Sequence, residues 1–126
     1  MPTLSPYDYA IVRIVPFVER GEYINVGVIL FCRTRRFLEA RMTLDEQRLA
    51  ALAPQLDPAE VQARLDLILG ICGGAGSIGQ LSLAERFHWL TTPRSTIIQV
   101  SPVHAGLCHD PANVLEHLLE TMVHVA

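Results

Sequence analysis

The sequence contains no lysine, and all ten of its basic residues are arginine. Lysine forms Schiff bases with carbonyl substrates, and its ammonium group holds nucleotide phosphates in Walker-type loops. Its absence excludes both chemistries, together with a lysine general base. Charge of either sign is scarce, because charged residues make up 18% of the 126 residues and the formal net charge is −3. This balance argues against broad nucleic-acid binding.

Cysteine is also scarce, and no Cys-x-x-Cys pair occurs among Cys32, Cys72 and Cys108. An odd number of unpaired thiols is more typical of a reducing cytosol than of a disulfide scaffold. The longest charge-free stretch, residues 67–84, contains five glycines and would make a poor membrane helix. The first positive charge is Arg13, so the basic start of a secretion signal is missing. We therefore expect a soluble, cytoplasmic protein that does not enter a membrane.

Hydrophobic residues are plentiful, at 50% of a chain with the length of one domain, residues 1–126. Runs rich in β-branched residues predict strands over 9–16, 24–32 and 37–42, separated by turns at Gly21 and at "RTRR". The second run is apolar on both faces, which predicts a central strand covered on both sides. A fourth strand is predicted over 95–100.

Each predicted helix has its own start signal. Thr43 with Glu46 forms a capping box for a helix to about Leu52, and Ser82 with Glu85 marks a short helix through Trp89. Aspartate followed by proline opens the other two helices, at Asp57–Pro58 and Asp110–Pro111. The sequence thus predicts one α+β domain, a mostly antiparallel four-stranded sheet packed with three or four helices.

Two short motifs resemble phosphate sites but lack the required context. "GAGSIG" (74–79) has the glycine spacing of a dinucleotide loop, yet a helix start rather than a strand precedes it. We therefore favour a flexible connection between helices. "RTRR" (33–36) can grip phosphate through guanidinium groups, but a solvated hairpin tip fits the negative net charge better.

The first two strands contain residues that are unusual in a sheet. Arg13 shares a strand face with aliphatic residues, so we expect a structural ion pair to Glu39 or Asp8. Asn25 and Gly27 lie within the central strand, where glycine removes packing and usually permits close approach of backbone or ligand.

Histidine and cysteine together do not form a recognisable metal or nucleophile signature. All five histidines lie in the last 39 residues, and His104, Cys108 and His109 have ligand chemistry without a zinc spacing. No base is poised beside a thiol in the local sequence. We therefore expect no metal and no cofactor.

The densest polar stretch surrounds the predicted fourth strand. Ser95, Gln99 and Ser101 share one face of it, with Arg94 and His104 near opposite ends and Arg86 shortly before. An antiparallel strand normally turns a polar face to water, but this combination also suits an anion or a peptide backbone. Both interpretations stay open.

Two long motifs, "EYINVGVILFC" (22–32) and "RFHWLTTPRSTIIQVSPVHAGLC" (86–108), resemble the bacterial family called domain of unknown function 3037. The similarity covers roughly Tyr7 to Val123. The resemblance implies small stand-alone proteins, often encoded beside a kinase resembling the toxin-type serine/threonine kinases, and it implies no settled activity. It carries over these motif positions: Arg13, Asn25, Gly27, Arg86, Trp89, Pro93, Arg94, Ser95, Gln99, Ser101, Pro102, His104 and Gly106.

Two functions follow as hypotheses. The first is a non-catalytic interaction or adaptor module that regulates a neighbouring enzyme such as that kinase, binding through some of the polar positions above, Asn25 included. The second is a phosphate-directed hydrolase or transferase, in which Arg86 and Arg94 hold the anion, Ser95 orients it and His104 acts as general acid or base. A homodimer is compatible with either hypothesis.

Overall fold

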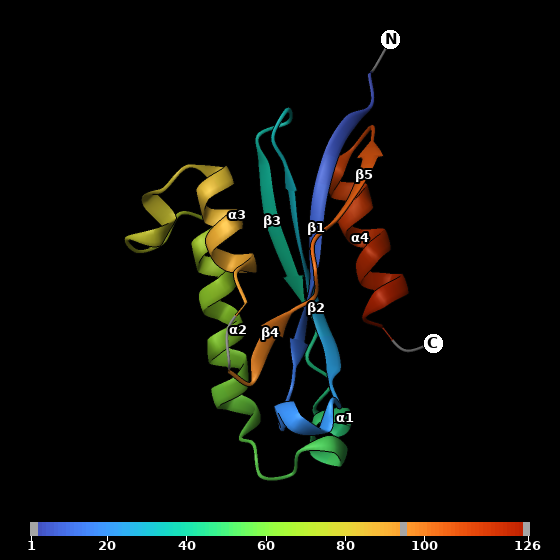
Figure 1. Cartoon of the computed structure of the whole chain (residues 1–126), viewed down its shortest axis with the longest axis vertical. Helices are drawn as coiled ribbons and strands as arrows, with labels where there is room; N and C mark the ends of the chain where they lie inside the picture. The colour runs from blue at the N-terminus through green and yellow to red at the C-terminus, as the bar shows by residue number, and fades with distance from the viewer. Residues whose placement is uncertain (1–2, 94–95, 125–126) are drawn as a thin grey trace.

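A computed structural model describes residues 3–93 and 96–124, which form one antiparallel sheet between helices (Figure 1). Strands β1 (Ser5–Ile14), β2 (Ile24–Cys32) and β3 (Phe37–Met42) are consecutive antiparallel neighbours. Two further strands, β4 (Ile98–Val100) and β5 (His104–Cys108), both pair with the other edge of β1. Both β1 and β2 therefore lie inside the sheet, as the apolar pattern of 24–32 predicts for the second strand.

The predicted α+β fold is confirmed: the antiparallel sheet has four strands in the order β3-β2-β1-β4, and a fifth short strand, β5, also pairs with β1. The chain after α3 forms two short strands in line, β4 against residues 12–14 and β5 against residues 5–9. Pro102 lies in the gap between them, and it has no N–H group to donate to a ladder. A strand that begins at Ile98 therefore stops before Pro102, and pairing resumes at His104.

Helices cover both faces of the sheet. Helices α1 (Glu46–Leu52), α2 (Pro58–Cys72) and α3 (Leu83–Thr91) lie on one face, and α4 (Pro111–Met122) lies on the other (Figure 1). Short 3-10 turns occupy Val18–Arg20 and Ile78–Gln80. The predicted helix starts at Asp57, Ser82 and Asp110 are confirmed, since each side chain accepts a hydrogen bond from a backbone N–H of the first turn.

The predicted start of the first helix was wrong by two residues. Asp45, not Thr43, caps α1, because its carboxylate accepts hydrogen bonds from the backbone N–H groups of Gln47 and Arg48 at 3.0 and 3.2 Å. Thr43 still belongs to the sheet edge, since its N–H donates to the carbonyl of Val26 at 2.7 Å.

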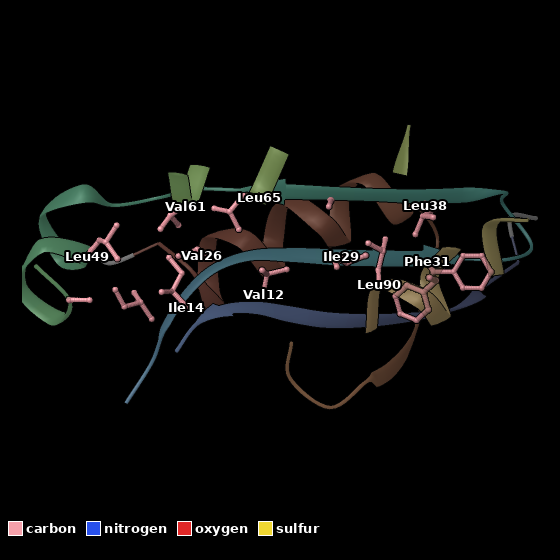
Figure 2. Close-up of a cluster of buried hydrophobic side chains, with 14 residues drawn as sticks. Val12, Ile14, Val26, Ile29, Phe31, Leu38, Leu49, Val61, Leu65 and Leu90 are labelled. Carbon is pink, nitrogen blue, oxygen red and sulfur yellow. The ribbon is translucent and has the colours of Figure 1, made fainter. Parts of the chain in front are cut away.

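Two hydrophobic cores share the sheet. The larger core lies under α1, α2 and α3, and Figure 2 shows side chains from those helices filling it together with strand residues such as Val12 and Ile29. The smaller core lies under α4 and consists of Ile11, Val28, Leu30, Leu115, Leu118, Leu119 and Val123. Alternate residues of β1 and β2 supply the two cores, which is why the second strand is apolar on both faces.

The close approach expected at Gly27 is made by backbone. Gly27 pairs with Val12 on one side and Met42 on the other, and the register of β1 and β2 shifts beside it. A Cβ atom added to Gly27 would lie 2.7 Å from the carbonyl oxygen of Arg41, which is closer than carbon and oxygen tolerate. The glycine therefore allows β3 to approach β2 at this irregular point of the sheet.

Across the described part of the chain, the structure contains no helix with the length and apolar character needed to span a membrane.

Candidate functional site

An apolar groove lies at the surface beside α2 and α3. It encloses about 560 Å³ and lies between the last turns of α2, the glycine-rich loop after it, Trp89 of α3 and the beginning of β4. Its apolar lining includes Leu67, Ile71, Ile78 and Ile98, and its rim carries one charge of each sign, from Arg64 and Asp66. The groove therefore offers shape and hydrophobic surface rather than a concentration of one charge.

The groove exists because α2 is apolar all round in its last two turns. Residues 67–72 have the sequence Leu-Ile-Leu-Gly-Ile-Cys, so no face of the helix receives a polar side chain there. Ile68 and Ile71 pack against the large core, but Leu67 points away from it and is 68% exposed. One side of this helix end thus presents leucine to solvent.

The glycine-rich loop builds one wall of the groove. Gly74 and Gly76 have φ values of 97° and 72°, a left-handed conformation that favours glycine. Gly79 packs so tightly against Gly74 that a Cβ atom would collide with its backbone, and Gln80 donates to the Gly74 carbonyl at 3.0 Å. The loop follows a helix, as the sequence predicts, and its glycines are explained by this compact turn.

Arg86 fixes the same region from α3. Its Nε donates to the carbonyl of Leu81 at 3.0 Å, and its Nη1 donates to the carbonyls of Ile71 and Cys72 at 3.3 and 3.0 Å. The Ile71 and Cys72 carbonyls lie in the last turn of α2, where a cation is also favoured by the helix dipole. Arg86 therefore joins α3 to the end of α2 and holds the groove wall in place.

The apolar surface continues on both sides of Trp89. A second hollow of about 410 Å³ lies between Leu81, Ala84 and Trp89, and a smaller one joins Trp89 to Ile68. Trp89 is 38% exposed and Leu81 is 36% exposed. We call the surface from Leu67 over Trp89 to Leu81 the Trp89 groove.

His104 lies on the opposite side of the sheet from Arg86. It pairs with Tyr9, whose ring belongs to the α4 face, and the two ring centroids are 5.3 Å apart. Arg86 extends from α3, which covers the other face. The structure does not bring these two residues together at one site, and Arg94 and Ser95 lie outside the described residues.

Ser101 is 3% exposed and completes the sheet between β4 and β5. Its N–H donates to the Ile11 carbonyl and its Oγ accepts from the Ile11 N–H, both at 2.8 Å. The hydroxyl in turn donates to the carbonyl of Pro102 at 2.9 Å. The side chain thus supplies a ladder bond where the strand is interrupted.

Asn25 and Gln99 flank Arg13 across three adjacent strands, since both are its register partners. The Asn25 Nδ2 donates to the carbonyl of Met122 at 3.0 Å, and the Gln99 Nε2 donates to the carbonyl of Thr96 at 2.9 Å. By register both side chains project from the α4 face of the sheet, although Gln99 also borders the smaller hollow beside Trp89.

The expected ion pair of Arg13 with Glu39 or Asp8 was wrong. The Arg13 guanidinium carbon lies 4.2 Å from the ring centroid of Tyr23, and the ion pairs found among the described residues do not include Arg13. Neither acid is a cross-strand neighbour of Arg13. Asp8 lies five residues earlier on the same strand, β1, and Glu39 of β3 pairs with Leu30 of β2.

Two of the three thiols, those of Cys72 and Cys108, have raised pKa values. Burial raises the pKa of Cys72 to about 11, against a smaller lowering effect of the nearby Arg86 charge. Burial also raises the pKa of Cys108. A protonated thiol is a poor nucleophile at neutral pH. Among the residues that the structure describes, no cluster of three or more His, Cys, Asp or Glu side chains is placed to hold a metal ion.

A comparison with family models gives one result that covers most of the chain. The model described as Protein of unknown function (DUF3037) matches residues 9–123. The chain belongs to this family. The resemblance carried by the motifs at 22–32 and 86–108 is therefore confirmed, and the family description assigns no activity to DUF3037. Searches of curated proteins and of solved structures found no match for this chain.

Sequence reasoning emphasised the polar side chains of 86–109 and missed the Trp89 groove. The available signal was the run of six residues without a polar side chain at the end of α2. A helix on the surface of a sheet needs only one apolar face, so an apolar circumference indicates a second contact. Which residues complete that surface depends on α2, α3 and β4 meeting in space.

Proposed function

We propose that this DUF3037 protein is a non-catalytic adaptor that binds an apolar segment of a partner protein in the Trp89 groove. The observation that carries the proposal is Leu67, which is 68% exposed on a helix end that is apolar all round and which lines the same groove as Trp89. Contiguous apolar surface of this kind marks interaction sites on soluble proteins. Tryptophan is also among the residues that contribute most at protein interfaces.

The extent of the surface favours a polypeptide over a small molecule. The hollow on the Leu67 side of Trp89 measures about 560 Å³ and the hollow on the Leu81 side about 410 Å³. An amphipathic helix presents apolar side chains at intervals of three and four residues, so it can fill successive hollows along one line. Glu85 and His88 border the second hollow and supply a polar rim.

Regulation of a neighbouring enzyme is the role we propose for this binding. The motif resemblance points to a kinase resembling the toxin-type serine/threonine kinases as the first partner to test. The raised pKa values of Cys72 and Cys108 and the separation of Arg86 from His104 support a binding role over the phosphate-directed chemistry.

The test compares two exposed leucines on different surfaces. Leu67→Asp places a charge in the groove, whereas Leu107→Asp changes a residue of β5 that is 63% exposed and lies outside it. Tagged wild-type protein, purified from its native host, should recover a stoichiometric partner that Leu107→Asp retains. With the purified partner, Leu67→Asp should weaken binding by about tenfold to a hundredfold.

Trp89 provides a direct readout, because it is the one tryptophan of the chain. Binding of the partner in the groove should shift the emission of Trp89 to shorter wavelength, and the shift should saturate at the stoichiometry found by calorimetry. Equal binding by both leucine variants, or turnover of a small substrate without a stoichiometric partner, would contradict the proposal.

A further inference from the structure

A second polar site lies on the other face of the sheet. Asn25, Arg13 and Gln99 come from β2, β1 and β4, and their register pairing places the three side chains in one row on the α4 face. The row lies at the C-terminal end of α4, because Asn25 Nδ2 donates to the carbonyl of Met122. All three residues are partly exposed.

Arg13 carries a charge that the described residues do not neutralise through an ion pair. Its guanidinium lies over the ring of Tyr23, and its Nε is buried without a hydrogen-bond acceptor in that part of the chain. The electronegative end of α4 favours a cation nearby but provides no acceptor to this atom. A buried donor left unpaired is costly, which indicates that an acceptor is missing from this arrangement.

Asn25 has a buried acceptor atom that is also unpaired. The bond from its Nδ2 to Met122 fixes the orientation of the amide, so Oδ1 is the atom left over. That oxygen is also buried and accepts no hydrogen bond from the described residues. A donor on Arg13 and an acceptor on its register partner therefore lie side by side, each without its counterpart.

We propose that this row, the Arg13 site, binds a carboxylate that has an N–H group beside it, as in an N-acyl amino acid or the C-terminal residue of a peptide. The carboxylate accepts from the Arg13 guanidinium, whose planar fork matches two carboxylate oxygens. The neighbouring N–H donates to Asn25 Oδ1. Tyr23, which is 49% exposed, moves aside from the guanidinium to admit the ligand.

The experiment is a titration of the ¹⁵N-labelled full chain followed by NMR. The probes are N-acetylalanine, an acetylated trialanine with a free carboxylate, and the same peptide with its carboxylate amidated. The two carboxylates should shift resonances of Arg13, Tyr23 and Asn25 with saturation, and the amide should bind about tenfold more weakly or not at all. Tighter binding of the tripeptide would identify a peptide as the source, and equal binding would identify the terminal residue alone.

Matched arginine variants test the site itself. Arg13→Gln should lose the titration and Arg13→Lys should weaken it, because lysine lacks the fork. Arg41→Gln is the control. Arg41 lies on β3, on the same face of the sheet as Arg13, but it is ion-paired with Glu116. Leu67→Asp should bind the probes as wild type does. Loss of partner binding in the Trp89 groove can therefore be distinguished from loss of carboxylate binding at the Arg13 site.

Three outcomes would overturn the proposal: equal binding of the carboxylate and amide peptides, the same shifts with inorganic phosphate at equal concentration, or the absence of any saturable shift. The last would mean that water alone fills the gap between Arg13 and Asn25. The comparison of the carboxylate and amide peptides uses wild-type protein. It therefore tests carboxylate binding even if Arg13→Gln fails to fold.

Discussion

At the scale of the residue, Ser101 shows how a single hydroxyl maintains an interrupted strand. It replaces a backbone partner for Ile11, whose N–H would otherwise be buried without an acceptor. Residues of this kind are easily mistaken for binding residues. From the sequence alone, a serine just before a proline can belong either to the sheet's hydrogen bonding or to an exposed polar face.

We predict that Ser101→Ala lowers the free energy of unfolding by about 1–3 kcal/mol, since it leaves the Ile11 N–H unpaired. Urea denaturation measures the change. Ser77→Ala is the control, because Ser77 is exposed and its side chain makes no capping bond. Equal stability of the two variants would show that Ser101 is free for another role.

Two glycines should respond to alanine in opposite directions. In Gly27→Ala the new Cβ would lie 2.7 Å from the Arg41 carbonyl oxygen, so β3 must shift, and we expect a loss of about 1–3 kcal/mol. Gly70 lies inside α2, and in Gly70→Ala the nearest atom is Ala75 Cβ of the following loop at 3.5 Å, an ordinary contact. That variant should gain about 0.5–1 kcal/mol. Thermal or urea melts that show the same sign for both would contradict this account.

At the scale of the element, the helix starts were predictable because each cap is local. Asp57, Ser82 and Asp110 bond to N–H groups two or three residues later, so the signal lies within one short stretch. The hairpin strands β2 and β3 were predicted with their observed bounds for the same reason. By contrast, β5 pairs with residues 5–9, roughly a hundred positions earlier, and its own sequence has no clear alternation.

The functional surfaces were less predictable than the elements. Arg86 was assigned to a binding face from its residue type, but its hydrogen bonds to Ile71 and Cys72 cross 15 and 14 positions and follow no local spacing rule. The stacking of Arg13 on Tyr23 likewise depends on the turn that follows β1. Sequence patterns identify which residues are unusual, and tertiary packing decides what they contact.

We predict that Arg86→Ala destabilises the protein by about 1–3 kcal/mol, because carbonyls at the end of α2 lose a charged donor. Arg86→Lys should recover only part of this loss, since one ammonium group cannot reproduce the directed fork. Arg64→Ala, on the exposed side of α2, should change the stability by less than about 0.5 kcal/mol. Hydrogen exchange should show faster opening of residues near Cys72 in Arg86→Ala, and unchanged rates there would argue against the clamp.

At the scale of the whole molecule, the partly buried thiol of Cys72 couples stability to alkaline pH. Its folded-state pKa of about 11 lies above the ordinary value of 9.0, so the unfolded chain releases this proton first as the pH rises. The contribution of Cys72 to stability is therefore fully present below pH 9.0 and is lost between pH 9.0 and about 11.

We predict that Cys72→Ala reduces the fall in unfolding free energy over that interval, measured by urea denaturation at several pH values. Tyr7 and Cys108 also have raised pKa values, so the variant should retain part of the slope. An unchanged slope would mean that Cys72 ionises equally easily in both states. Alkylation by iodoacetamide at pH 8 should accordingly be slow in the folded protein and fast after unfolding.

The position of β1 between β2 and the β4–β5 pair has a consequence for biosynthesis. The ribosome completes β1 at Ile14, but its second neighbour is not finished until Cys108. At about 5–20 residues per second, one edge of the first strand waits on the order of 5–20 s for its partner. During that time the β1–β2–β3 meander also lacks α4, so Ile11, Val28 and Leu30 stay uncovered. The nascent chain is therefore most open to chaperones, and to wrong pairing with a second chain, in the interval before its last thirty or so residues emerge.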